Sequence, residues 1–321
     1  MEPVIRVEHL EKRFKVKTKL FEEKQYVRAV NDVSFSIGKG KTLGIVGESG
    51  CGKSTLGRTI LKIHEPDGGR IYYQGTDITD YNMNQMHPLR QKLQMIFQDP
   101  YASLNPRYTV GEMISEPMAI YKMYSREERL EIVQQLMETV GLKPDHIRRY
   151  PHEFSGGQRQ RIGIARTLAL NPEFIVCDEP FSALDVSIQA QIINLLERIQ
   201  DEKQISYIVV AHDLNAVRHI SHDIGVMYLG HLVEMGPADM IYKRPLHPYT
   251  QALMAAIPVA DPNAQGMMNR KILQGEVPSP IHVPAGCPFH TRCQYCTQDC
   301  RERKPELKDI GGRKAACHLH A

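Results

Sequence analysis

Residues 47–54 of this 321-residue chain read GESGCGKS, which matches the phosphate-loop pattern GxxxxGK[ST] in full. The apolar run at 43–46 before the loop is typical of a buried parallel strand, and a helix is expected after it. In such a loop the glycines let successive backbone N–H groups point at phosphate oxygens, and the helix start adds its positive end. The stretch therefore predicts a nucleotide-binding α/β domain.

Two side chains of the loop have defined chemical roles in this pattern. Lys53 can reach the β- and γ-phosphates, and the Ser54 hydroxyl is placed to ligate Mg²⁺. The residues expected to contact the nucleotide in and beside the loop are Gly47, Ser49, Gly50, Cys51, Gly52, Lys53, Ser54 and Thr55.

A second apolar run, at 174–177, ends in the acidic pair Asp178-Glu179. With a phosphate loop upstream, such a pair supplies the carboxylates of a nucleotide site. Asp178 is expected to hold the Mg²⁺ shell, and Glu179 is expected to polarise the attacking water as a general base. Cys51 and Cys177 are interpreted as small packing residues rather than reactive thiols.

The remaining pattern is that of strands alternating with helices. Strands are expected at 4–10, 33–37 and 207–211, and a long helix at 188–200. A helix over 125–140 would start at an N-cap, Ser125, and bury one face. That face consists of Leu130, Val133, Leu136, Met137 and Val140. The order predicts a largely parallel sheet with a mainly helical subdomain inserted at about 105–168.

Composition excludes some classes of function. The formal net charge of +3 is small for this length and argues against nucleic acid as a partner. No apolar stretch approaches the roughly 20 residues of a membrane-spanning helix, and the N-terminus lacks a secretory signal. The chain is therefore expected to stay in the cytosol and to reach a membrane only through a partner.

A second glycine-containing helix start distinguishes this chain from other phosphate-loop proteins. Residues 154–161 read FSGGQRQR, with Ser155 at the cap position and Gly156 and Gly157 after it. One nucleotide seldom needs two such anion-binding helix starts from one protomer. A small-molecule kinase would leave this motif, including Gln158, unexplained.

With this motif the sequence resembles the nucleotide-binding subunit of ABC transporters, whose signature it matches. Gln98 matches the family's Q-loop, Asp185 its D-loop and His212 its switch histidine. Phe14 is the best match for the aromatic residue that stacks on adenine, with Tyr26 as a competitor. The resemblance implies a RecA-like P-loop NTPase fold with an inserted helical subdomain.

The resemblance also implies a mechanism. Two such domains pair head to tail, and each ATP lies between one phosphate loop and the partner's Ser155-Gly156-Gly157. Gln98 and His212 would sense the γ-phosphate, and Gln98 would join Ser54 and Asp178 around Mg²⁺. Lys53, Gln98, Glu179 and His212 are the expected catalytic residues.

A closer resemblance, to the ATPase subunits of dipeptide and oligopeptide importers, covers essentially the whole chain. It is carried by residues 98–106, 247–253 and the cysteine-rich end from 286. It implies a second, often paralogous ATPase subunit, two membrane permease subunits and an extracytoplasmic binding protein, with the chain peripheral at the cytoplasmic face of the membrane. Residues 101–107 are expected to contact the permease. Nickel and glutathione importers share this ATPase type, and a soluble ABC ATPase of DNA repair or translation is a more distant alternative.

The C-terminal end, after a core domain expected at 1–255, is predicted to be a small irregular appendage at 256–321 without a core of its own. Five of the seven cysteines crowd into it. In the resembled family Cys287, Cys293, Cys300 and Cys317 ligate a [4Fe–4S] cluster. Soft thiolates in a core-poor segment favour such a cluster or zinc. Cys296 departs from the family pattern, so a Zn²⁺ site that includes His318 or His320 is an alternative to the cluster. A further alternative is that the thiols bind no metal.

Overall fold

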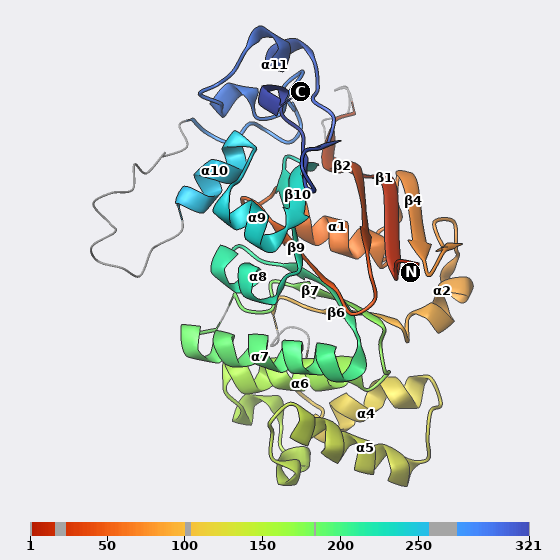
Figure 1. Ribbon diagram of the computed structural model, residues 1–321. Coiled ribbons are helices and arrows are strands. Elements are labelled where there is room, and N and C mark those ends of the chain that lie inside the picture. Colours follow the sequence, from red (N-terminus) through yellow and green to blue (C-terminus); the bar gives the residue numbers. More distant parts are fainter. Residues whose placement is uncertain (1, 17–23, 100–103, 183, 257–274, 321) are drawn as a thin grey trace, which may run out of the picture.

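The computed structural model describes residues 2–16, 24–99, 104–182, 184–256 and 275–320. Its centre is a mixed sheet whose middle strands are parallel (Figure 1). In spatial order its strands are β11 (Lys308–Asp309), β12 (Lys314–Ala315), β10 (His231–Pro237), β9 (Asp223–Tyr228), β3 (Thr42–Val46), β8 (Ser206–Val210), β7 (Phe174–Asp178) and β6 (Leu93–Ile96).

The parallel part of this sheet positions the predicted site. β3 pairs in parallel with β8 and β9, and β7 pairs in parallel with β8 and β6. The carboxyl ends of parallel strands meet at one edge of a sheet, which is where open α/β sheets bind ligands. The phosphate loop follows β3, the acidic pair ends β7, His212 follows β8 and Gln98 follows β6. Segments far apart in the sequence therefore meet at this edge.

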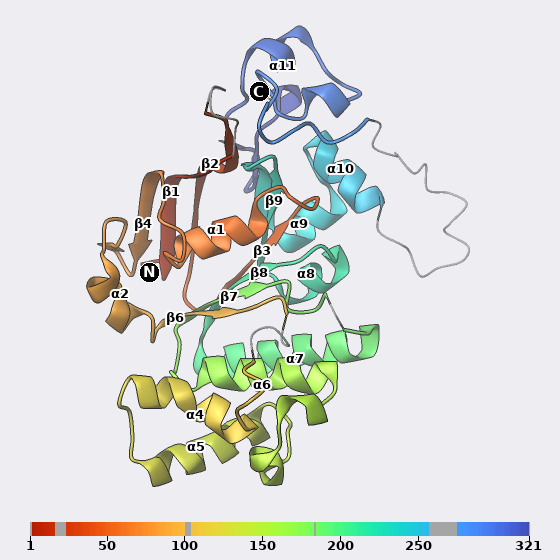
Figure 2. The ribbon, with the colours of Figure 1, turned by 180° about the vertical axis from the view of Figure 1, so that it is seen from behind.

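A second, antiparallel sheet packs near the first. Its strands in spatial order are β2 (Tyr26–Ile37), β1 (Ile5–Lys15), β4 (Gly68–Tyr73) and β5 (Thr76–Asp77). Helix α1 (Lys53–Ile60), which follows the phosphate loop, contacts strands of both sheets and lies between them in both views (Figures 1 and 2). Its Leu56 and Ile60 are fully buried in the core shared by the two sheets.

The other helices are short to medium in length. They are α2 (Met83–Leu89), α4 (Val110–Ile120), α5 (Arg126–Thr139), α6 (Gly156–Leu168), α7 (Val186–Lys203), α8 (Leu214–Ile220), α9 (Ala238–Lys243), α10 (Pro248–Ala255) and α11 (Gln298–Glu302). Turns of 3₁₀ helix are η1 (Pro144–Arg148), η2 (Pro151–Glu153), η4 (His290–Arg292) and η5 (His318–His320). Helices α4 and α5 gather at one end of the molecule, and the C-terminal segment lies at the opposite end (Figure 2).

The strands and helices predicted from the sequence are present, but those expected at 4–10 and 33–37 are longer, because β1 spans Ile5–Lys15 and β2 spans Tyr26–Ile37. The runs at 43–46, 174–177 and 207–211 lie in β3, β7 and β8, and the helix at 188–200 lies in α7. Ser125 caps α5, and its hydroxyl accepts the N–H of Glu128 at 3.2 Å. One residue of that helix was wrongly assigned to the core. Leu130 is 53% exposed, because the packed stripe of α5 is narrower than its apolar pattern.

The C-terminal segment has no separate core among its described residues, as expected, but it contributes buried residues to the core of the large sheet. Within the described range 275–320, Phe289, Cys287 and Cys300 are buried in the same cluster as the large sheet. Strand β12 extends that sheet by pairing with β10. The irregular segment is stable because it borrows the core of the domain on which it packs.

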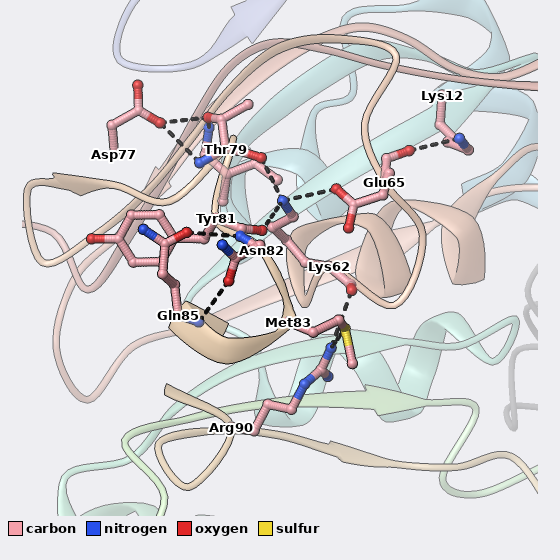
Figure 3. Close-up of polar contacts among 11 residues, drawn as sticks. Lys12, Lys62, Glu65, Asp77, Thr79, Tyr81, Asn82, Met83, Gln85 and Arg90 are labelled. Carbon is pink, nitrogen blue, oxygen red and sulfur yellow. Dashed lines mark hydrogen bonds and ion pairs between the residues drawn. The ribbon is translucent and has the colours of Figure 1, made fainter. Parts of the chain in front are cut away.

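A lysine fixes the far end of α1 (Figure 3). The Lys62 side chain is buried, and its ammonium donates to the carbonyls of Thr79 at 2.6 Å and Tyr81 at 2.8 Å. It also pairs with Glu65 at 2.8 Å. A buried charge must be satisfied in this way, so these bonds tie the helix behind the phosphate loop to the chain that leads into α2.

Among the residues that the structure describes, no helix is both long enough and apolar enough to span a bilayer.

Candidate nucleotide site

The phosphate loop curls between β3 and α1 as its sequence predicts. Gly47, Gly50 and Gly52 have φ angles of 152°, 78° and 108°, which side chains rarely tolerate. A Cβ at Gly52 would lie 1.9 Å from the carbonyl oxygen of Ala29, and one at Gly47 would lie 2.2 Å from that of Met227. These two glycines are therefore required by close backbone approaches as well as by the turn.

Lys53 lies inside the curve of this loop. Lys53 is only 5% exposed, and its ammonium donates to the carbonyls of Gly47 at 2.8 Å and Glu48 at 3.1 Å. The positive charge is thus held at the centre of the loop, where an anionic ligand would bring its own charge. The Cys51 thiol nearby has a raised pKa because it is buried, which agrees with a packing role.

Asp178 ends strand β7 and faces the start of α1. The Ser54 hydroxyl donates to its Oδ1 at 2.6 Å, and Arg58 pairs with its Oδ2 at 3.2 Å. The carboxylate is 1% exposed, so these two partners offset the cost of burying its charge. The hydroxyl, the carboxylate and the amide of Gln98 are oxygen donors of the kind that Mg²⁺ prefers.

Sequence reasoning missed Arg58, although a signal was available. Ser54 and Arg58 are four residues apart on α1, so they lie on the same face of the helix, one turn from each other. A basic residue at this spacing from the loop serine was a candidate partner for the strand-end carboxylate.

Glu179 is brought together with two of its expected partners. Gln98 Nε2 donates to Glu179 Oε2 at 2.7 Å, and His212 Nδ1 lies 3.7 Å from the same oxygen. The backbone of Glu179 has a φ of 47°, and its N–H donates to the carbonyl of Val210 at 2.8 Å. An uncommon backbone conformation held by the neighbouring strand thus aims this carboxylate at the edge of the sheet.

The signature motif forms a separate helix start. The Ser155 hydroxyl accepts the N–H of Gln158 at 3.4 Å, and the Gln158 side chain accepts the N–H of Ser155 at 2.9 Å. This capping box leaves Ser155 and Gly156 exposed. Within the described ranges, no hydrogen bond or ion pair joins residues 155–158 to the phosphate loop or to the acidic pair.

Gly157 lets the signature helix α6 pack closely against α7, the helix after the D-loop. A Cβ at Gly157 would lie 2.4 Å from Cγ2 of Ile188, so α6 and α7 begin in close contact. Asp185 caps α7 by accepting the N–H of Ile188 at 2.9 Å. Ala183 of the D-loop lies outside the described residues, as do residues 100–103 of the stretch after the Q-loop.

The two candidate adenine-stacking residues lie on neighbouring strands. Phe14 is opposite Val27, and Tyr26 is opposite Lys15, in the pairing of β1 with β2. Both rings are partly exposed, at 36% for Phe14 and 43% for Tyr26. Phe14 meets the ring of His64 edge to face, with centroids 5.3 Å apart.

The C-terminal thiols gather without forming a recognisable metal site. The N–H of Cys287 donates to the carbonyl of Cys300 at 2.8 Å, and that of Cys296 to the carbonyl of Cys293 at 3.2 Å. Burial, reinforced by the nearby Cys300, Cys317 and Cys293, raises the pKa of the Cys287 thiol to about 12. Among the described residues, no group of three or more His, Cys, Asp or Glu side chains is arranged to hold a metal ion. The predicted cluster therefore has no support in this geometry.

The loop between β3 and α1, with a strand-end carboxylate bonded to the loop serine, defines a P-loop nucleotide-binding protein. A family model described as ABC transporter matches residues 30–182. Another, described as the C-terminal region of oligopeptide/dipeptide transporters, matches residues 233–300.

Curated relatives match the chain over nearly its whole length. The oligopeptide transport ATP-binding protein AppF of Bacillus subtilis is 50% identical, over 100% of this chain and 98% of AppF. The dipeptide transport ATP-binding protein DppF of Escherichia coli is 48% identical, over 98% of this chain and 94% of DppF. This chain belongs to the ABC transporter family of ATP-binding proteins.

A solved structure agrees with this assignment. The ATP-binding cassette MJ0796, a dimer in a post-hydrolysis state bound to ADP and Pi, matches with a TM-score of 0.65 and 29% identity. The match covers 73% of this chain and 98% of that chain. The ABC ATPase fold expected from the sequence is confirmed.

Proposed function

We propose that this chain is the ATP-hydrolysing subunit that powers an importer of dipeptides or oligopeptides. The observation that carries the ATPase part is the Glu179 carboxylate, which is held by Gln98 at 2.7 Å beside the phosphate loop and Asp178. The peptide part rests on the match of residues 233–300 and on relatives whose names include oligopeptide and dipeptide transport.

The geometry supports a division of labour among the residues. The backbone of residues 47–55 and the Lys53 ammonium would bind the phosphates, and Ser54, Asp178 and Gln98 would hold Mg²⁺. When bound, the ion would neutralise charge on the phosphates. Glu179 would accept a proton from the attacking water. His212, whose Nδ1 lies 3.7 Å from Glu179 Oε2, would orient the Glu179 carboxylate. Phe14, or Tyr26 in its place, would stack on the base.

The open signature helix supports a head-to-tail dimer. Ser155, Gly156, Gly157 and Gln158 begin a helix whose positive end is exposed at Ser155 and Gly156, and the Ser155 and Gln158 side chains bond only within their own capping box among the described residues. They would complete the nucleotide site of a second ATPase subunit, either a copy or a paralogue, and Asp185 would lie near that interface. Each ATP would then hold two subunits together, so binding and hydrolysis would close and reopen the pair.

The proposed transporter has further partners. Two membrane permease subunits and an extracytoplasmic binding protein would complete it, with this chain on the cytoplasmic face of the membrane. Residues 101–107 are the proposed permease contact, and their described part includes the exposed Asn105 and Arg107. The same proposal assigns residues 1–255 to the ATPase domain and residues 256–321 to the C-terminal region.

The test is ATPase activity of the complex co-purified through a tag on this chain and reconstituted in lipid with its binding protein. Stimulation by a dipeptide or a longer peptide, abolished by Glu179→Gln, is the expected result. Stimulation by Ni²⁺ or glutathione alone would overturn the substrate and keep the ATPase assignment. Failure of any membrane subunit to co-purify would contradict the transporter assignment and favour a soluble ABC ATPase.

The thiols permit a separate proposal. We infer that Cys287, Cys293, Cys300 and Cys317 bind a [4Fe–4S] cluster, or Zn²⁺ with Cys296, on the chemistry of these residue types and not on their arrangement, because soft thiolates in one small segment suit these metals. Iron, sulfide and zinc analysis of anaerobically purified protein decides between them. Protein with neither metal would leave the cysteines as packing residues.

A further inference from the structure

A buried arginine of the C-terminal segment reaches the phosphate loop. Arg292 Nη1 lies 2.7 Å from Glu48 Oε2, and its Nη2 lies 3.1 Å from Oε1, across 244 residues of sequence. The two parallel bonds make a bidentate guanidinium–carboxylate pair, which is among the strongest polar contacts. The Arg292 side chain is 5% exposed and that of Glu48 is 26% exposed, so water screens the pair weakly.

Glu48 is the second residue of the phosphate loop, and all its polar groups are engaged. Its N–H donates to the hydroxyl of Tyr249 at 2.8 Å. Its carbonyl accepts the Lys53 ammonium at 3.1 Å. One residue therefore joins Arg292, Tyr249 and the lysine that is expected to meet the phosphates.

The support behind Arg292 is an aromatic layer. Phe289, three residues earlier, is 1% exposed, and its ring centroid lies 5.3 Å from that of Tyr228 and 5.4 Å from that of Tyr249. Tyr228 and Tyr249 are themselves 4.7 Å apart. The Arg292 guanidinium carbon lies 6.0 Å from the centroid of the Tyr228 ring. Tyr249 and Phe289 come from the stretch 247–253 and from the cysteine-rich end, to which the ATP chemistry assigns no role.

Charge gives this contact a consequence for ligand binding. A carboxylate in the phosphate loop repels the nucleotide's phosphates, because like charges at short range in a partly buried site are costly. The guanidinium neutralises that carboxylate and holds it in a bidentate pair. We propose that Arg292 is a positioning residue for nucleotide binding, which neutralises and orients Glu48 so that the phosphate loop accepts MgATP.

This inference rests on the proposed ATPase function, and it can fail separately. The experiment measures the Kd for MgATP and the KM and kcat of ATP hydrolysis of the full chain and of the complex. Its variants are Arg292→Met, Arg292→Lys, Glu48→Gln and the double variant Glu48→Gln/Arg292→Met. Arg303→Met is the matched control, because Arg303 pairs with Asp299 on the exposed side of the same segment.

We expect Arg292→Met to raise Kd and KM about tenfold with kcat nearly unchanged, since the unpaired carboxylate opposes binding rather than the chemical step. Glu48→Gln and the double variant should both have a lower Kd than Arg292→Met, because neither keeps a carboxylate that opposes the phosphates. Arg292→Lys should lie between, because it keeps the charge and loses the fork. Arg303→Met should change neither constant.

A double variant that binds as weakly as Arg292→Met would overturn the proposal, as would an Arg292→Met protein with the parent's Kd. If Arg292→Met does not fold, as judged by its thermal unfolding, Arg292→Lys and Glu48→Gln still test the proposal. The Kd of Arg292→Lys for MgATP should then be higher than that of Glu48→Gln. A parent chain that binds no MgATP would refute the proposed function itself. An Arg292→Met variant with the parent's Kd would refute only the role of Arg292.

Discussion

The chain contains two glycine-containing helix starts that suit phosphate groups, and the structure treats them in opposite ways. At the phosphate loop, Lys53 and Asp178 are buried at 5% and 1% exposure, and they are bonded to carbonyls of the loop and to Ser54 and Arg58 of α1. At the signature helix, Ser155 is exposed and bonds within its own capping box. The phosphate loop is therefore the complete half of a site, and the signature helix start is the open half. A nucleotide site shared between two subunits requires both kinds of half.

The largest expected effect breaks the chemistry of the complete half. Glu179→Gln should lower kcat by about 10²–10⁴-fold, because the amide cannot accept the proton of the attacking water. The Kd for MgATP should stay within a few-fold of the parent, since Gln98 and the loop remain. Single-turnover hydrolysis and nucleotide titration measure the two quantities. Glu197→Gln, at a carboxylate that contacts His219 on the surface, is the control and should retain activity.

A smaller effect tests the open half. Ser155→Ala and Ser125→Ala remove matched capping boxes at the starts of α6 and α5, and each should lower the free energy of unfolding by about 1 kcal/mol. Only Ser155→Ala should also lower ATP hydrolysis, on the order of tenfold, because its hydroxyl would meet a nucleotide held by the other subunit. Chemical unfolding and ATPase assays separate the two effects. Equal activity losses would show that α6 matters only for stability.

A pH titration probes the layer behind the phosphate loop. Burial, and less strongly the neighbouring His320, lowers the pKa of His247 to about 3, and His247 Nδ1 accepts the N–H of Tyr249 at 3.1 Å. The unfolded chain takes up a proton at His247 near pH 6.5, and the folded chain does not. The stability that the neutral His247 ring contributes is therefore fully present above pH 6.5. It is lost as the pH falls toward 3, at up to about 1.4 kcal/mol per pH unit.

His247→Asn keeps an acceptor at the cap of α10 and removes the titrating ring, so its stability should fall less between pH 7 and pH 5 than that of the parent. His152→Asn, at an exposed histidine, should leave the parent's slope unchanged. Denaturant unfolding at the two pH values gives both slopes. Identical slopes for parent and His247→Asn would contradict a neutral buried ring.

The smallest expected effect concerns the helical end of the molecule. Leu130→Gln on α5 should change the free energy of unfolding by less than about 0.5 kcal/mol, because Leu130 is 53% exposed. Met137→Ala on the same helix should cost about 2–5 kcal/mol, because Met137 is fully buried. Thermal or denaturant unfolding of both variants checks this contrast. A large loss with Leu130→Gln would contradict the exposure of this side chain.

The sequence by itself determined the residues whose chemistry is local. The loop at 47–54 and the helix start at 154–158 could be read directly, because phosphate binding depends on backbone turns and helix caps that neighbouring residues define. The alternation of apolar runs with helices also determined the parallel sheet, and with it the edge at which Gln98, Asp178, Glu179 and His212 meet.

Only the tertiary structure decided the partnerships between distant residues. Arg292 with Glu48 joins residues 244 positions apart, and Tyr249 with Glu48 joins residues 201 positions apart. No periodicity records such contacts, because they depend on how strands and segments pack rather than on spacing along the chain. The core of the C-terminal segment has the same origin. Phe289 is a single apolar residue in an irregular stretch, and it is buried because Tyr228 and Tyr249 of the ATPase domain surround it.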